Sequence, residues 1–163
     1  KTIIRCVSLL VASIALLFQA TYAEEQFLIL DDAIIATAGE AWKTEDGAAM
    51  YLRHDVKLRA PDWRIHADRG NMTGKLEDPE LVVVDGNPAR IFISREADED
   101  PFKGSSKHIE FDPNNDAVEL KGEALVEKGR ESIRSRTIAY DLDEDTFSAG
   151  DDGRVRVVTT PKD

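Results

Sequence analysis

The side chains that could bind a metal ion are few and widely spaced in this sequence. No zinc-binding spacing links the three histidines, His54, His66 and His108. The run Asp141–Asp145 places aspartate at alternate positions and begins like a calcium loop, but Thr146 stands where that loop requires glycine. We therefore interpret the run as a solvated hairpin turn and predict no metal site.

The sequence also lacks the motifs and the apolar surroundings that residues for covalent or acid–base catalysis usually have. The chain has no Gly-x-Ser-x-Gly turn and no glycine-rich phosphate loop. Most of its 32 acidic residues cluster in turns or alternate with apolar residues, and none stands in an obviously apolar setting that would raise a carboxyl pKa. We predict a binding protein without a cofactor rather than an enzyme. The alternative is a glycan hydrolase that uses two of these carboxylates.

The balance of charge is acidic, with 21 lysines and arginines and a formal net charge of −11. Nucleic acid is a poor partner for such a domain, because its phosphates require a basic surface. One basic cluster stands out in the chain. Its side chains could lie near anionic headgroups, or they could simply be solvated on an outward strand face: Arg53, Lys57, Arg59, Arg64 and Arg69.

Residues 1–23 have the organisation of a secretory signal peptide. Lys1 and Arg5 precede an uncharged run, 6–18, and small residues stand before an expected cleavage site after Ala23. An uncleaved anchor is the alternative, although so short a run spans a bilayer poorly. Removal of this segment leaves residues 24–163, which we expect to form one cysteine-free domain.

Apolar residues in the remaining chain mostly recur at every second position, which is the period of a β-strand with one dry face. Turn signals rich in Gly, Asn, Asp and Pro interrupt this pattern at short intervals, among them Asp85–Pro88, Asp112–Asp116 and Lys128–Arg130. We predict an all-β domain of many short antiparallel strands, in a sandwich, jelly roll or barrel. The acidic segment Arg95–Ser106 is interpreted as an exposed loop.

The sequence also indicates an internal repeat. Residues 50–67 align with residues 118–135 at a constant offset, so that apolar or small residues coincide. Leu52 aligns with Leu120, for example. We infer that neither half buries its apolar face without the other. The inward residues are mostly Val, Ile, Leu and Ala, which could either fill a core or line a slot for flexible acyl chains.

Four stretches follow one another in a characteristic order. Leu81–Ala89 ends in Gly-Asn-Pro-Ala, Ser106–Asp112 follows, Asp116–Val126 contains Val-x-Leu-x-Gly-x-Ala, and Ile133–Asp141 ends in Ile-Ala-Tyr-Asp. With a closing strand at Gly153–Val157, this succession resembles the LptA/OstA family of lipopolysaccharide-transport proteins over residues 27–160. The sequence departs from the family pattern where phenylalanine replaces the usual tyrosine of the second stretch.

The resemblance implies a twisted, open β-jelly roll in the periplasm, whose apolar interior takes the lipid A acyl chains of lipopolysaccharide. It also implies head-to-tail pairing with further copies, and with LptC-like inner-membrane and LptD-like outer-membrane proteins, through terminal strands at Phe27–Ile35 and Val155–Thr159. An accessory envelope protein that uses the roll for strand pairing without lipid is the alternative. The residues expected to contact lipid are Val56, Leu58, Ile65, Leu120, Ala124, Val126, Ile133, Ile138 and Tyr140.

Overall fold

The computed structural model of the chain describes residues 34–95, 100–150 and 154–161. Every regular element in these ranges is a β-strand, which confirms the all-β prediction. The expected signal peptide lies outside the described residues. Within them there is no helix with the length and apolar character needed to cross a membrane.

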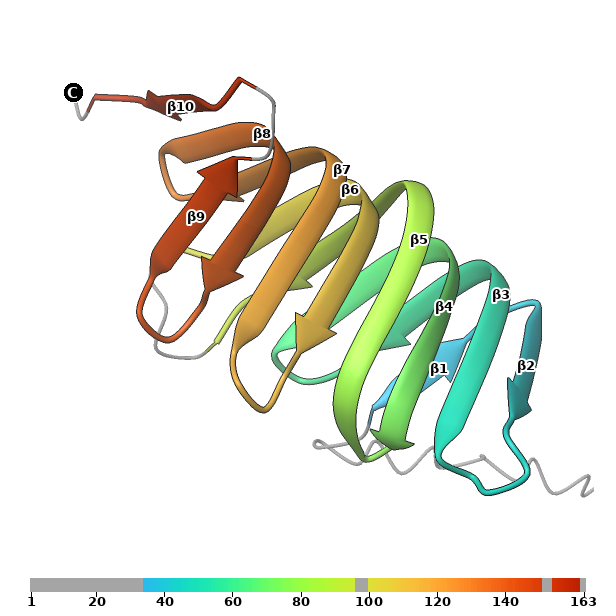
Figure 1. Cartoon of the computed structure of the whole chain (residues 1–163). Coiled ribbons are helices and arrows are strands. Elements are labelled where there is room, and N and C mark those ends of the chain that lie inside the picture. Colours follow the sequence, from blue (N-terminus) through green and yellow to red (C-terminus); the bar gives the residue numbers. More distant parts are fainter. Residues whose placement is uncertain (1–33, 96–99, 151–153, 162–163) are drawn as a thin grey trace, which may run out of the picture.

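The strands of the described chain form one antiparallel sheet in the order β1-β3-β4-β5-β6-β7-β8-β10, while β2 pairs with β3 and β9 pairs with β8. Consecutive long strands are joined by hairpins, so the sheet follows the chain from one end of the molecule to the other (Figure 1). The strands are β1 (Ile35–Thr37), β2 (Glu40–Lys43), β3 (Ala49–Arg59), β4 (Trp63–Lys75), β5 (Asp78–Ile93), β6 (Phe102–Asp112), β7 (Ala117–Lys128), β8 (Glu131–Asp141), β9 (Thr146–Gly150) and β10 (Arg156–Thr159).

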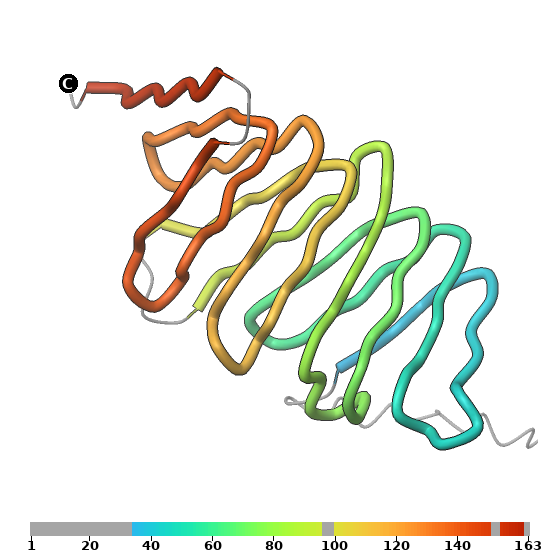
Figure 2. Tube along the Cα trace, viewed as in Figure 1, coloured from blue at the N-terminus to red at the C-terminus, as the bar shows by residue number. Residues whose placement is uncertain are grey.

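Each long strand bends once, where an irregularity interrupts its pairing, and the trace in Figure 2 shows these bends one behind another. β-Bulges bend a strand in this way because they insert unpaired residues into the ladder. The bends lie at 54–55 in β3, 67–68 in β4, 86–88 in β5, 106–107 in β6, 122–123 in β7 and 136 in β8.

The bends divide the sheet into two layers that face each other. The front layer of Figure 1 consists of β2, β9 and residues 49–53, 69–75, 78–85, 108–112, 117–121 and 137–141. The rear layer consists of β1, β10 and residues 56–59, 63–66, 89–93, 102–105, 124–128 and 131–135. The result is an open β-roll, as the family resemblance implied.

The long strands differ in detail from the short ones expected, since β3 to β8 have between 11 and 16 residues. Asp85–Pro88, predicted as a turn, instead forms the bend inside β5. Gly, Asn and Pro permit an irregular backbone there, but the ladder resumes at Ala89, so the chain changes layer without reversing direction.

The internal repeat is confirmed by the backbone as well as by burial. All residues of the aligned pairs Leu52/Leu120 and Ala67/Ser135 are at least 95% buried. At the same offset, the bend residues of β3 coincide with those of β7, and both pairs have positive φ: His54 (63°) and Asp55 (53°) in β3, Gly122 (80°) and Glu123 (58°) in β7. The β3–β4 and β7–β8 hairpins are therefore equivalent units of the roll.

The predicted loop at Arg95–Ser106 is wrong for its second part, because β6 begins at Phe102. Residues 96–99 lie outside the described chain. Phe102 and Ser106 are buried, and the alternation of Phe102, Gly104 and Ser106 places all three on the inner face. The small and polar residues of this segment suggested a loop. In the structure, the small size of Gly104 and Ser106 lets the two layers approach each other.

Candidate functional site

The interior between the two layers contains all nine residues that the sequence predicted as lipid contacts. Each is buried, with exposed fractions from 0% to 6%, and each belongs to the single hydrophobic cluster of the described chain. The front layer supplies Leu120, Ile138 and Tyr140. The rear layer supplies Val56, Leu58, Ile65, Ala124, Val126 and Ile133. The structure thus brings the nine together as one surface, and lipid contact stays a prediction.

The same surface includes side chains that the sequence analysis did not select, notably Trp63, Phe102, Ile109 and Phe111. Two aromatic pairs cross from one layer to the other. Trp63 meets Phe111, and Phe102 meets Tyr140 with ring centroids 4.9 Å apart. A period-two count through Phe102 and through Ile109–Phe111 would have found the last three of these residues.

The two layers pack closely at Gly104 in the rear part of β6. A Cβ atom at this position would lie 2.8 Å from Cγ2 of Ile91, on the neighbouring strand of the same layer, and 2.9 Å from Cδ2 of Leu120 in the front layer. Contacts this short mean that a side chain at this position would force Ile91 or Leu120 to shift, so glycine suits the close packing seen here. The buried core residues of β3 to β8 show that the interior of the described chain is filled by its own side chains.

A seam runs along the side of the roll opposite the bends, where hairpin ends of the two layers meet. Among the residues that the structure describes, two ion pairs cross it. Arg95 donates to Asp116, and Lys128 Nζ donates to Asp145 Oδ1 over 2.6 Å. The Tyr140 hydroxyl also donates to Asp145; burial first and this carboxylate second raise the pKa of Tyr140 well above its ordinary value. In the described chain these side-chain contacts help to hold the seam closed.

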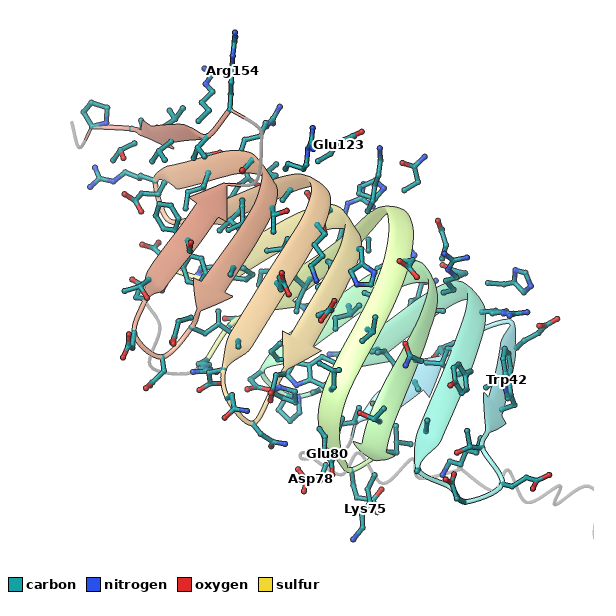
Figure 3. All side chains as sticks on the ribbon, in the orientation of Figure 1. Trp42, Lys75, Asp78, Glu80, Glu123 and Arg154 are labelled. Carbon is teal, nitrogen blue, oxygen red and sulfur yellow. The ribbon has the colours of Figure 1, made fainter. Side chains whose placement is uncertain are left out.

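The two ends of the roll leave strand edges without a partner. In the described chain β1, β2, β9 and β10 each pair on one side only. Large apolar side chains are exposed there, including Ile35 (54%) at one end and Val157 (48%) at the other. Trp42 lies at the β2 end (Figure 3). Val155–Thr159 was predicted as one terminal strand and corresponds to β10, whereas most of the other, Phe27–Ile35, lies outside the described residues.

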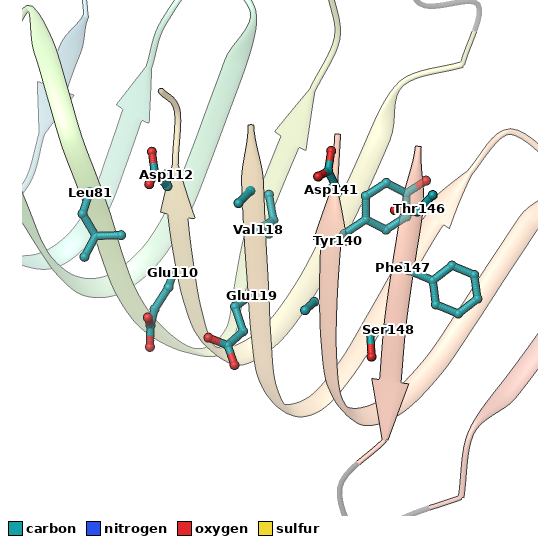
Figure 4. A pocket seen from close by; sticks show the side chains of 12 residues that line it. Leu81, Glu110, Asp112, Val118, Glu119, Tyr140, Asp141, Thr146, Phe147 and Ser148 are labelled. Carbon is teal, nitrogen blue, oxygen red and sulfur yellow. The ribbon is translucent and has the colours of Figure 1, made fainter. Parts of the chain in front are cut away.

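The outer face of the front layer carries an acidic groove of about 520 Å³ that crosses β5 to β9 (Figure 4). Glu110 and Glu119 stand directly opposite each other on neighbouring strands. Lys121 Nζ lies 2.8 Å from Glu110 and 3.0 Å from Glu119, so it compensates both carboxylates. The hydrogen bond from Lys121 and that from His108 lower the pKa of Glu110.

His108 on β6 connects Glu110, which lines this groove, to Asp85 on β5. Its Nδ1 lies 2.8 Å from Asp85 Oδ1 and its Nε2 lies 3.0 Å from Glu110 Oε1. Partial burial disfavours the imidazolium, but the two carboxylates outweigh burial and hold the pKa of His108 above its usual value. Arg69 completes the chain of contacts by donating to Asp85 over 3.1 Å. The network ties the front parts of β4, β5 and β6 together on the outside.

The basic cluster predicted from the sequence is divided between the layers. Arg53 lies over the Trp42 ring and Arg69 pairs with Asp85 in the front layer. Lys57, Arg59 and Arg64 project from the rear layer. The bends at 54–55 and 67–68 cause this division, because neighbours in sequence on either side of a bend belong to different layers.

The aspartate run near the C-terminal end forms the β8–β9 hairpin turn, as predicted. Asp141 Oδ1 accepts hydrogen bonds from the backbone N–H groups of Asp143 and Glu144, and Asp145 binds Lys128. These partners use the carboxylate oxygens that a cation would need. Across residues 34–95, 100–150 and 154–161, no three His, Cys, Asp or Glu side chains gather as a metal-binding group.

In the part of the chain that the structure describes, the fold is a two-layered open roll with an apolar interior and with strands at both ends that pair on one side only. The family described as "LptA/(LptD N-terminal domain) LPS transport protein" matches residues 22–146, so the chain belongs to this family. The family is named for transport and not for a reaction.

Comparison with solved structures supports the fold. The chain is similar to LptH, described as the LptA homologous periplasmic component of the lipopolysaccharide transport device from Pseudomonas aeruginosa, with a TM-score of 0.72. The match covers 80% of this chain and 97% of LptH, at 19% sequence identity. No protein with a curated description matches the sequence.

Proposed function

We propose that the protein is a periplasmic component of lipopolysaccharide transport, and that lipid A acyl chains pass between its two layers toward the outer membrane. Family membership supports the transport role. The observation that carries the lipid path is the continuous apolar interior, which includes residues from β3 to β8. Burial of acyl chains there would contribute about 0.8 kcal/mol for each CH₂ group.

Lipid entry requires the layers to separate, because the interior is filled by its own side chains. The bends join the layers on one side, whereas the opposite side is the seam. When the seam opens, acyl chains replace the apolar contacts that the layers make with each other. This exchange keeps apolar surface buried, so the movement needs no covalent chemistry and little net free energy.

The unpaired strand edges would connect this roll to others. β1 and β2 form one end and β9 and β10 the other (Figure 1), so each end presents backbone groups to a further strand. The partners are further copies of this chain, head to tail, and the equivalent rolls of LptC-like and LptD-like proteins. Their apolar interiors would then form one continuous path.

The first experiment asks whether the purified protein retains lipid. Mass spectrometry of lipid extracted from protein isolated from its envelope should detect lipopolysaccharide. Binding of added lipopolysaccharide should persist in high salt, since acyl burial rather than charge supplies the affinity. Association through the terminal strands without any retained or bound lipid would instead establish the accessory role.

A second experiment tests entry through the seam. Cysteines are placed on either side of it with Lys128→Cys and Asp145→Cys, in a Cys6→Ser background, and joined by a cleavable bismaleimide. The joined protein should lose lipopolysaccharide binding and recover it when the linker is cleaved, which also shows that the fold survives.

The matched control joins two residues of one layer, Lys75→Cys and Asp78→Cys, which are paired across the β4–β5 hairpin. This linker should leave lipopolysaccharide binding unchanged, because it does not connect the layers. Equal binding by the seam-joined and hairpin-joined proteins would show that acyl chains do not enter between the layers.

A further inference from the structure

The outer face of the rear layer carries a second groove, of about 730 Å³, which crosses β3 to β7. Five lysines and arginines line it, namely Lys57, Arg59, Arg64, Arg90 and Lys103, against one carboxylate, Glu127. This groove is basic although the chain has a formal net charge of −11. Its cations come from four different strands, so only the folded sheet brings them together.

The register places two of these cations in direct opposition. Arg59 on β3 is the Cα partner of Arg64 on β4. Like charges directly opposite each other destabilise a sheet. In the front layer the comparable pair, Glu110 and Glu119, is compensated by Lys121.

In the rear layer the one carboxylate of the groove, Glu127, stands opposite Lys103, and among the described residues no printed contact compensates the Arg59–Arg64 pair in the way that Lys121 compensates the two glutamates. Lys57 pairs with Asp55 over 2.6 Å, but no described ion pair involves the other four cations of the groove. Four guanidinium and ammonium groups therefore have donors available for an anion.

The floor of the groove between these cations is apolar. Phe92 and Leu125 are half-buried and belong to the outer face of the layer. The guanidinium carbon of Arg64 lies 4.5 Å from the centroid of the Phe92 ring, and Lys103 stands opposite Phe92 on the next strand. An aromatic ring flanked by cations suits a ligand that combines an anionic group with an apolar portion.

We infer that this groove binds the phosphate group of an anionic lipid, with the adjoining apolar part of the lipid on Phe92 and Leu125. The groove lies outside the roll, so the inference goes beyond transport through the interior. Arginine suits phosphate because its planar guanidinium forms two parallel hydrogen bonds to the oxygens. Bound phosphate would also relieve the repulsion between Arg59 and Arg64.

The test titrates the purified protein, followed by NMR, with dihexanoyl phosphatidylglycerol below its micelle concentration and separately with inorganic phosphate. The lipid should shift backbone signals of β3 to β7 and bind at least about tenfold more tightly than inorganic phosphate. Arg59→Gln/Arg64→Gln/Arg90→Gln should weaken lipid binding by about tenfold or more.

The control variant is Lys75→Gln/Arg130→Gln/Arg136→Gln, which removes the same charge from exposed positions away from the groove. It should bind the lipid as the unmodified protein does. The seam-joined protein should also retain this binding, which separates the groove from the proposed lipid path. Equal affinity for inorganic phosphate, equal weakening by the control variant, or tighter binding of an acidic peptide than of the lipid would overturn the inference.

Discussion

The indole ring of Trp63 meets the phenyl ring of Phe111 edge to face, with centroids 5.5 Å apart and an interplanar angle of 73°. Trp63 begins the rear part of β4, and Phe111 is the second-last residue of β6, in its front part. Because the two residues belong to different layers at their seam, this contact helps to hold the roll closed. Aromatic pairs of this geometry add to the stabilisation that burial alone provides.

Trp63→Ala should lower the free energy of unfolding by about 3–5 kcal/mol, since it removes a buried aromatic side chain and leaves a cavity. Urea denaturation followed by circular dichroism measures the change. The control is Trp42→Ala at the β2 edge, where the ring is 41% exposed and the expected loss is below about 1 kcal/mol. If Trp63→Ala and Trp42→Ala lowered the free energy of unfolding equally, the Trp63–Phe111 contact would not stabilise the closed roll.

Gly104→Ala should destabilise the protein by about 1–3 kcal/mol, because the new methyl group would collide with Ile91 and Leu120. Thermal and urea unfolding would both detect this. Gly150→Ala provides a matched control, since a Cβ atom there meets nothing within 4 Å, and its effect should stay within about 0.5 kcal/mol. A neutral Gly104→Ala variant would mean that Ile91 and Leu120 make room for the methyl group without cost, and that close packing does not require glycine here.

Asp145→Asn should lower the pKa of Tyr140 toward its ordinary value without restoring it fully. Burial is the larger cause of the raised pKa, and the Asp145 carboxylate is the second. Ultraviolet titration of tyrosine ionisation measures the change. Asp143→Asn lies in the same turn, where only its backbone contacts Asp141, and should leave the Tyr140 titration unaltered.

The His108 network predicts a stability maximum at mildly acid pH. The folded-state pKa of His108 lies above 6.5, so its stabilising contribution is complete below that pH and is lost as pH rises through the raised pKa. The pKa values of Asp85 and Glu110 lie below 3.8 and 4.5, so their contributions are lost only as pH falls through the lowered values.

His108→Gln should therefore flatten the decline in the thermal midpoint between mildly acid and alkaline pH. His54→Gln should keep the decline of the unmodified protein, because the His54 imidazole is 72% exposed and lies 3.9 Å from Glu40. If both variants decline in parallel with the unmodified protein, His108 does not stabilise the front layer through its two carboxylates.

Much of the fold could be predicted from local pattern. Period two in residues such as Val118 and Leu120 is enough to separate inward from outward side chains, and all nine predicted interior residues are buried. The internal repeat could also be recognised in the sequence, because the spacing of apolar residues along each strand determines which side chains are buried. The turn at Asp141–Asp145 followed from its own chemistry, because aspartate accepts hydrogen bonds from the backbone of the next residues.

The layer to which each half-strand belongs could be decided only by the tertiary structure. A bulge at His54–Asp55 or Gly122–Glu123 changes the direction of a strand without an obvious interruption of its apolar pattern. The basic groove shows the consequence, since Arg90 and Lys103 join Arg59 and Arg64 while Arg53 and Arg69 do not. The sequence by itself determined which faces are dry, because that depends on near neighbours along the chain. Partners across strands and layers depend on register and bending, which only the assembled sheet specifies.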